Sequence, residues 1–436
     1  MLIETFGFSP AVATAIAFLV FLLCALVVLW VVRSAPSRTL VLSSGPEGSS
    51  FHRWAKAYQK ALTAHGVAVE IRTSAGSLEN FERMQDPASG VDIAFVASGL
   101  VKDANLTGLV SLGSISTQPI WVYYRAEKPI ARLSELQGRR ITVGVPGSGT
   151  RLLAMTLLQA NGIQGAPTVF LDQDSTAAAT DLLEGRVDAV FLMGDSASLR
   201  TLRSLGRAPG IQLFSFDQAD AYVRRLQYLT RLELPKGSID LGQNLPAEDV
   251  VLVGPTVELV AREGLNSAHC DMLLEAARGI HGRPGLLQRR GEFPAAIEHE
   301  LPLSQDALRY YKSGSGFLYR ALGSYWLASL ANRVLVAIVP LFLLLFPAFR
   351  LLPMAYRLSI QLRLYRCYRP LLRVEHETFG PLTRERISDL QRKLDEIEAT
   401  VNALNVPASF ADRYYWLRSH LAFVRQRLTN LAPSEA

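Results

Sequence analysis

The residues best suited to chemistry form a short loop of glycines and hydroxyls, Gly147–Thr150, between a strand signal and a helix signal. Ile141–Val145 before it is β-branched, and Leu152–Ala160 after it has helical periodicity. A strand, a glycine loop and a helix together aim backbone N–H groups and the positive end of a helix dipole at one anion. We therefore predict a cradle for a small anionic ligand. The alternative is a tight strand-to-helix turn that binds nothing.

Three familiar motifs do not fit this loop. Gly144 and Gly149 have the spacing of a phosphate-binding loop, but residues 150–151 read Thr-Arg where a Lys followed by Ser or Thr is required. A dinucleotide-binding fingerprint needs a third glycine, and the chain has Leu152 there. A nucleophile elbow needs a glycine two residues before Ser148, which is absent. The loop therefore favours binding of a carboxylate over nucleotide binding or catalysis.

Other strand signals also end in polar loops. These pairs of strand and loop are Thr39–Leu42 with Ser43–Ser50, Val67–Thr73 with Ser74–Ser77, and Val91–Val96 with Ala97–Gly99. The stretches Val91–Phe95 and Val187–Phe191 are nearly interchangeable, and each closes a helix–turn–strand unit. Parallel strands bring their carboxyl ends to one edge of a sheet, so such loops meet at a ligand crevice.

The repeated unit predicts an α/β domain of two lobes over residues 36–318, with a cleft between the lobes. We expect lobe 1 over about 38–122 and 232–312, and lobe 2 over about 123–231. The chain would cross between them near Ile120–Arg125 and return near Tyr228–Leu234.

The charge of the chain is unevenly distributed. Its 436 residues have a formal net charge of +6, but six arginines gather between Arg350 and Arg373, where no acidic residue occurs. They directly follow an apolar run, so they indicate a membrane surface rather than nucleic acid. Three scattered cysteines cannot form a disulfide framework.

Two apolar runs predict membrane spans. Ala11–Val32 is long enough to cross a bilayer and lacks a convincing cleavage site, so we expect residues 1–35 to be an uncleaved anchor. Val334–Phe349, within a segment 319–352, is the second, with Tyr319, Tyr325 and Trp326 as an interfacial aromatic belt. The arginines then place both termini in the cytoplasm and residues 33–332 outside.

The C-terminal segment 353–436 begins with the basic stretch and continues with two heptad-like runs. Apolar residues recur at spacings of three and four from Ile387 to Leu404 and from Phe410 to Leu428, around a break at 405–409. They predict an antiparallel helical hairpin. Its partner could be its own second helix, another membrane subunit or a second copy of the chain.

Several of these segments, taken in order, resemble one family. They are Ser74–Asn80 with Val91–Phe95, Leu136–Thr150, and Leu183–Phe191. Over residues 39–300 the chain resembles the TAXI-type extracytoplasmic solute-binding proteins of TRAP transporters. The resemblance implies a type II periplasmic binding fold whose cleft holds small organic acids or amino acids. The first loop departs from the family, because it reads Gly48-Ser-Ser-Phe51 where glycine-richer loops ending in Thr-Tyr-Tyr are usual.

The expected ligand-binding residues come from these loops and from the resemblance. They are Ser44, Ser49, Ser50, Phe51, Ser77, Asn80, Ser98, Ser148, Gly149, Thr150, Arg151, Asp174 and Gly194. We expect no cofactor and no metal site, because His269, His281 and His299 are too scattered. No nucleophile with a nearby base is evident in the sequence, so an enzyme is not expected.

The leading hypothesis is a receptor for a small anionic metabolite, anchored in the bacterial inner membrane with its main domain in the periplasm. It would present its ligand to TRAP-type permease subunits. The alternative is a sensor or envelope assembly protein, in which the outer domain signals through the second span to the cytoplasmic hairpin.

Overall fold

The computed structural model describes residues 10–33, 35–99, 106–322, 324–380, 383–404, 406 and 410–431. The chain forms two compact units. One is Ala35–Ala331, and the other joins Met1–Ser34 to Asn332–Ala436.

The first lobe of the Ala35–Ala331 unit is built on β11, β3, β1, β2 and β4 of a mixed sheet of order β10-β11-β3-β1-β2, in which β4 also pairs with β11. β10, at the edge of this sheet, packs with the first half of β11 into the core of the second lobe. β1 is parallel to β2 and β3, whereas β11 is antiparallel to β3, β4 and β10. The strands are β1 (Thr39–Ser43), β2 (Ala68–Arg72), β3 (Ile93–Ala97), β4 (Leu109–Thr117), β10 (Leu229–Leu234) and β11 (Val250–Arg262).

Helices cover both faces of this sheet. Phe51 and Tyr58 of α3 and Leu273 of α9 lie in a core with strand residues such as Phe95. On the other face, α4 packs through Phe81 and Met84. The elements of this lobe are α3 (Ser50–Thr63), α4 (Ser77–Gln85), the 3-10 helix η1 (Pro87–Ser89), α9 (Ser267–His281), α10 (Gln305–Ser313) and α11 (Phe317–Leu322).

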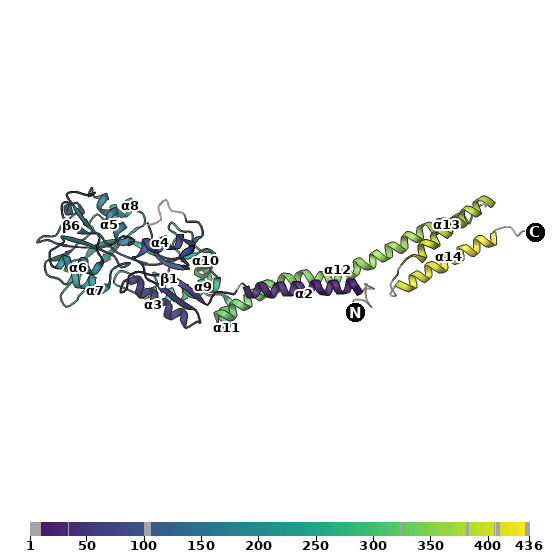
Figure 1. Ribbon diagram of the computed structural model, residues 1–436, viewed down its shortest axis with the longest axis horizontal. Coiled ribbons are helices and arrows are strands. Elements are labelled where there is room, and N and C mark those ends of the chain that lie inside the picture. The colour runs from purple at the N-terminus through teal and green to yellow at the C-terminus, as the bar shows by residue number, and fades with distance from the viewer. Residues whose placement is uncertain are drawn as a thin grey trace, which may run out of the picture. The chain divides into compact units, whose positions relative to one another are not determined.

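The second lobe has a five-stranded sheet of order β7-β6-β8-β5-β9, in which β7, β6 and β8 are parallel. Apolar residues of α5 and α8 fill one face, and those of α6 and α7 fill the other. Its elements are β5 (Trp121–Arg125), the 3-10 helix η2 (Leu133–Leu136), β6 (Arg140–Thr142), α5 (Gly149–Ala160), β7 (Val169–Leu171), α6 (Ser175–Leu183), β8 (Ala189–Leu192), α7 (Leu199–Gly206), β9 (Ile211–Leu213) and α8 (Ala219–Arg225). Figure 1 shows the helices of the two lobes in separate groups, which confirms the expected two-lobed α/β architecture.

The two crossings between lobes are adjacent strands. The first follows β4 at Gln118. The second lies inside β11, whose residues Val250–Pro255 pair with β10 while Val257–Ala261 pair with β3. Leu252 and its neighbours pack into the second lobe's core. The return crossing is therefore near Gly254 rather than at 228–234, because one continuous strand serves both lobes.

The remaining unit consists of long helices, which are α2 (Pro10–Arg33), α12 (Tyr325–Glu377), α13 (Arg384–Asn402) and α14 (Ala411–Leu431). By length and composition, one stretch among the described residues could cross a membrane, Tyr325–Leu343, while the apolar stretch Phe18–Arg33 is shorter. The apolar stretch of α12 thus supports the second expected span. The first span, and with it the two-span topology, stays a proposal.

The start of α12 corrects the expected aromatic belt. Tyr325 is buried in the first lobe's core and stacks on Tyr319 with ring centroids 3.8 Å apart. Trp326 donates from Nε1 to the His65 carbonyl at 2.8 Å. Aromatic rings with apolar faces and a polar tip serve a membrane interface and a protein surface equally well. Here they fix the first turn of α12 to the lobe.

The tail is a three-helix core rather than a self-contained hairpin. Leu371 of α12, Leu394 of α13 and Leu421 of α14 belong to one buried cluster, and α13 lies alongside α14 (Figure 1). Part of the expected break, residues 405 and 407–409, lies outside the described residues. The basic stretch is therefore helical and supplies the third wall of the hairpin's core.

Candidate functional site

Several of the expected ligand-binding side chains are helix caps. Ser49 accepts the His52 N–H at 3.1 Å and begins α3. Ser148 accepts the Arg151 N–H at 3.1 Å and begins α5. A hydroxyl at this position satisfies one of the unpaired N–H groups at a helix start. These two serines cap the helix starts that lie at the contact between the lobes. Each of them accepts its hydrogen bond within its own lobe.

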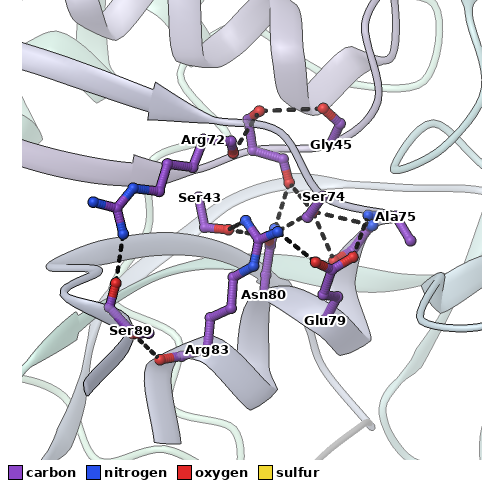
Figure 2. A network of polar contacts seen from close by, with 11 residues as sticks. Ser43, Gly45, Arg72, Ser74, Ala75, Glu79, Asn80, Arg83 and Ser89 are labelled. Atoms are coloured by element: carbon purple, nitrogen blue, oxygen red, sulfur yellow. Dashed lines mark hydrogen bonds and ion pairs between the residues drawn. The ribbon is translucent and has the colours of Figure 1, made fainter. Parts of the chain in front are cut away.

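Asn80 is the centre of a buried network at the strand ends of the first lobe (Figure 2). Its Oδ1 accepts the hydroxyls of Ser43 and Ser74 at 2.6 and 2.7 Å. Its Nδ2 donates to the carbonyls of Ser44 and Phe95 at 2.6 and 2.9 Å. These partners occupy both amide hydrogens and the oxygen, so Asn80 joins the ends of β1 and β2 to strand β3 within one lobe. Direct ligand contact by this side chain is not supported.

The two lobes meet on the carboxylate of Asp195, which follows β8 and is fully buried. Its Oδ2 accepts the Gly149 N–H at 2.7 Å, and its Oδ1 accepts the Thr150 hydroxyl at 2.8 Å. Across the cleft, the Ser77 N–H at the start of α4 lies 3.4 Å from Oδ2. One anion is therefore held by the N-termini of two helices, one from each lobe, as the loop chemistry predicts for a ligand.

Backbone hydrogen bonds flank this carboxylate on either side. The Ser50 N–H donates to the Gly194 carbonyl at 2.9 Å. The Glu79 N–H donates to the Gly147 carbonyl at 3.0 Å. Both bonds cross from the first lobe to the second, so the lobes are closed on each other.

Close approach requires glycines at the contact. A Cβ on Gly194 would lie 1.9 Å from Gln118 Oε1, and one on Gly76 would lie 2.6 Å from Asp195 Oδ2. The φ of Gly76 is +142°, a conformation that other residues rarely adopt. These positions explain why the strand-end loops are rich in glycine.

The other expected residues lie around this contact or away from it. Ser44 and Phe51 are buried within the first lobe, and Phe51 packs against Phe95 with ring centroids 5.5 Å apart. Ser98 bonds the Thr256 backbone beside the crossing strands. Two are partnered within the second lobe. These are Arg151, which pairs with Asp172, and Asp174, which caps α6.

Asp195 was missed by sequence reasoning. Glycines and hydroxyls indicate donors that bind an anion, whereas Asp195 supplies the anion itself. The available signal was an acidic residue directly after Gly194 in the loop that ends a buried strand. Its partners Ser77 and Gly149 are far away in sequence, so spacing gave no indication of the contact.

Charge at the site is set by burial. Burial raises the pKa of Asp195 above its usual range, although hydrogen bonds from Thr150 and Gly149 act in the opposite direction. Burial, followed by Lys56, lowers the pKa of His52, which favours a neutral ring. Burial and the nearby Arg203 lower the pKa of Arg53 at the start of α3. The contact between the lobes therefore holds one buried carboxyl group whose partners are hydroxyls and backbone N–H groups.

Catalytic and metal chemistry find little support. Within the described part of the chain, no group of three or more His, Cys, Asp and Glu could hold a metal ion. Two serines contact an imidazole, since Ser44 Oγ lies 3.5 Å from His52 Nδ1 and Ser114 Oγ of β4 lies 3.3 Å from His299 Nε2. Both serines are fully buried in this closed arrangement.

Cavities occur elsewhere in the chain. One of about 580 Å³ is lined by second-lobe and β10–β11 connection residues such as Tyr124, Ile239 and Val250. Another of about 600 Å³ lies among the tail helices and is lined by residues such as Tyr365, Arg413 and Trp416. Neither includes the loops around Asp195.

The solved structures that resemble this chain do so only weakly. The Escherichia coli periplasmic aliphatic sulphonate binding protein SsuA is 13% identical over 56% of this chain and 69% of its own, with a TM-score of 0.34. The substrate binding protein of an amino acid ABC transporter is 15% identical over 56% and 92%, at 0.33. The BenM effector binding domain with benzoate is 12% identical over 60% and 98%, at 0.39. At these values nothing about the ligand of this chain follows.

The family is clearer than the distant structures. Residues 51–312, more than half of the chain, match the NMT1-like family. The match includes α3, both sheets' crossing strands and the Asp195 contact. The chain therefore belongs to the NMT1-like family, and its two-sheet α/β domain has a periplasmic-binding-protein-like fold.

Proposed function

We propose that residues 35–331 form a receptor that closes two lobes over a small carboxylate. The observation that carries this proposal is the Asp195 carboxylate, which accepts N–H groups from the helix starts at Ser77 and Gly149. Donors arranged in this way suit any carboxylate of similar size. A ligand carboxylate would take this position and contact both lobes.

Contact with both lobes is what makes binding and closure one process. A ligand shifts a conformational equilibrium only by its difference in affinity for the two states. The closed state adds the Ser77 N–H to the donors of the second lobe. Ser50 and Gly194 would complete the closed site through their backbone bond. The receptor carries out no catalytic step.

The cellular setting follows from the two ends of the chain. We place the protein in the bacterial inner membrane with two spans, the lobed domain in the periplasm and both termini in the cytoplasm. The arginines from Arg350 to Arg373 support this orientation. TRAP-type permease subunits are the proposed partners, through the resemblance of Leu136–Thr150 and its neighbouring motifs to TAXI-type proteins.

The receptor proposal is tested by calorimetry on the full chain in detergent, with a panel of organic acids and amino acids. At least one should bind saturably. Gly149→Val should abolish that binding while the domain stays folded, because a branched side chain would enter the cradle. Unchanged affinity in this variant would make the loop a structural turn only.

Reporter fusions test the topology. An export-dependent reporter should be active at residue 200 and inactive at the C-terminus. Activity at the C-terminus would refute the two-span arrangement.

One observation favours a second candidate, a sensor or assembly protein. Helix α12 is continuous from Tyr325, buried in the first lobe's core, to Val374 in the tail core. A continuous helix can transmit a change in one lobe to the tail. If so, ligand should alter amide exchange in α13 and α14 of the full chain. A transport receptor without signalling predicts no change beyond residue 331.

A further inference from the structure

The Asp195 carboxylate sits where a bound ligand would be expected, and it comes from the chain itself. It is fully buried, and both its oxygens accept hydrogen bonds at 2.7 and 2.8 Å within the second lobe. Burying a carboxylate without partners is costly, so such a group stays buried where donors replace its water. Here the donors include the starts of α4 and α5, both long enough to carry a helix dipole.

The walls around this carboxylate leave little room for a second anion. Added Cβ atoms at Gly76 and Gly149 would lie 2.6 and 2.9 Å from the same oxygen, Asp195 Oδ2. A Cβ on Gly45 would lie 2.5 Å from the Asp195 backbone carbonyl. Loops of both lobes therefore fit closely around this one residue.

We propose that Asp195 is a built-in ligand, which closes the two lobes in the absence of a free carboxylate and reserves the cradle against simple carboxylate anions. This proposal rests on the proposed function, because it takes the cradle at Gly147–Thr150 as the place where the receptor binds an anion. A tethered group has a high effective concentration, so a free anion must compete with it. Only a ligand with further contacts in the cleft displaces Asp195, which makes the residue a determinant of specificity.

The first test uses formate as the probe and thermal unfolding of the full chain in detergent as the measurement. Asp195→Ala removes the carboxylate but keeps its donors, so formate should stabilise this variant saturably. At ten times its Kd the expected rise in Tm is about 3 °C. The wild type should not respond beyond the effect of chloride at equal ionic strength.

Two matched variants show whether the response belongs to the cradle. Asp195→Asn fills the same volume, so formate should leave its Tm unchanged. Asp174→Ala also removes a carboxylate that accepts backbone N–H groups at a helix start, but an exposed one within a single lobe. It should not respond either. A wild type that responds like Asp195→Ala, or a folded Asp195→Ala that does not respond, would overturn the proposal.

A second measurement does not depend on the alanine variant folding. The amides of Ser50 and Glu79 bond across the cleft, so hydrogen exchange reports closure. In the ligand-free wild type both should be protected, and Asp195→Asn should speed their exchange by about tenfold or more. Rapid exchange in the wild type would refute a closed resting state.

The outcomes separate the two proposals. Formate rescue of Asp195→Ala with no metabolite bound by the wild type would keep the built-in ligand and refute the receptor. A metabolite bound by the wild type without formate rescue would keep the receptor and refute the built-in ligand.

Discussion

Asn80 and Asp195 are both buried polar side chains at strand-end loops, yet they hold different things together. All partners of Asn80 come from the first lobe. The partners of Asp195 come from both lobes. A side chain whose bonds stay within one lobe contributes to the stability of that lobe. A side chain whose bonds span two lobes holds the lobes in the closed position. A ligand that makes the same bonds can therefore take its place.

The largest expected effect is from Asn80→Ala. It removes the amide donor to the Ser44 and Phe95 carbonyls and the acceptor shared by the Ser43 and Ser74 hydroxyls, all of them buried, so we expect a loss of about 3–4 kcal/mol in unfolding free energy. Urea denaturation of the full chain measures it. The loss should be the same with and without ligand.

Asn80→Asp is the control for this change. It keeps an acceptor for Ser43 and Ser74 but loses both donors, so it should remain destabilising. If Asn80→Ala reduces the free energy of ligand binding by more than it reduces the free energy of unfolding, Asn80 contacts the ligand. The contrast with Asp195 then fails.

A third buried group, Glu258 on β11, sharpens the comparison because its Oε2 has no hydrogen-bond partner among the residues that the structure describes. Burial, with a smaller contribution from Glu300, raises the pKa of Glu258 to about 7. The folded pKa lies above the unfolded value, so this group's stabilising contribution is complete below pH 4.5 and is lost as pH rises through 7.

Glu258→Gln should remove that pH dependence. Between pH 5 and pH 8, the free energy of unfolding of the variant should rise relative to that of the wild type by up to about 3 kcal/mol, as measured by chemical denaturation. The gain should be absent near pH 4. A difference independent of pH would show that Glu258 is not the titrating group.

The smallest expected effect is from Gly149→Ala. Its Cβ would lie 3.1 Å from Ser77 Cβ across the cleft and 2.9 Å from Asp195 Oδ2, so it should disfavour closure by about 1–2 kcal/mol. Faster exchange of the Ser50 and Glu79 amides would report it. Gly279→Ala in α9 meets nothing within 4 Å and should be neutral or slightly stabilising. Equal exchange in the two variants would contradict a closed cleft at Gly149.

The local parts of this fold could be predicted from the sequence. The predicted strand Thr39–Leu42 lies within β1, and the predicted helix Leu152–Ala160 lies within α5. Ser148 ends the predicted strand-to-helix loop as the N-cap of α5, whereas Gly149 and Thr150 already belong to the helix. Such features depend on neighbours a few residues apart, where backbone propensity and capping decide the outcome.

The sequence alone determined several strands and helices of the two lobes and the loops that carry polar side chains. Only the tertiary structure decided which loop faces which. Ser77, Gly149 and Asp195 are separated by 46 to 118 residues, so their meeting depends on how two sheets close around the crossing strands. The return crossing lies near Gly254 rather than at 228–234 for the same reason. An apolar run such as Val250–Arg262 does not reveal that its two halves belong to different lobes.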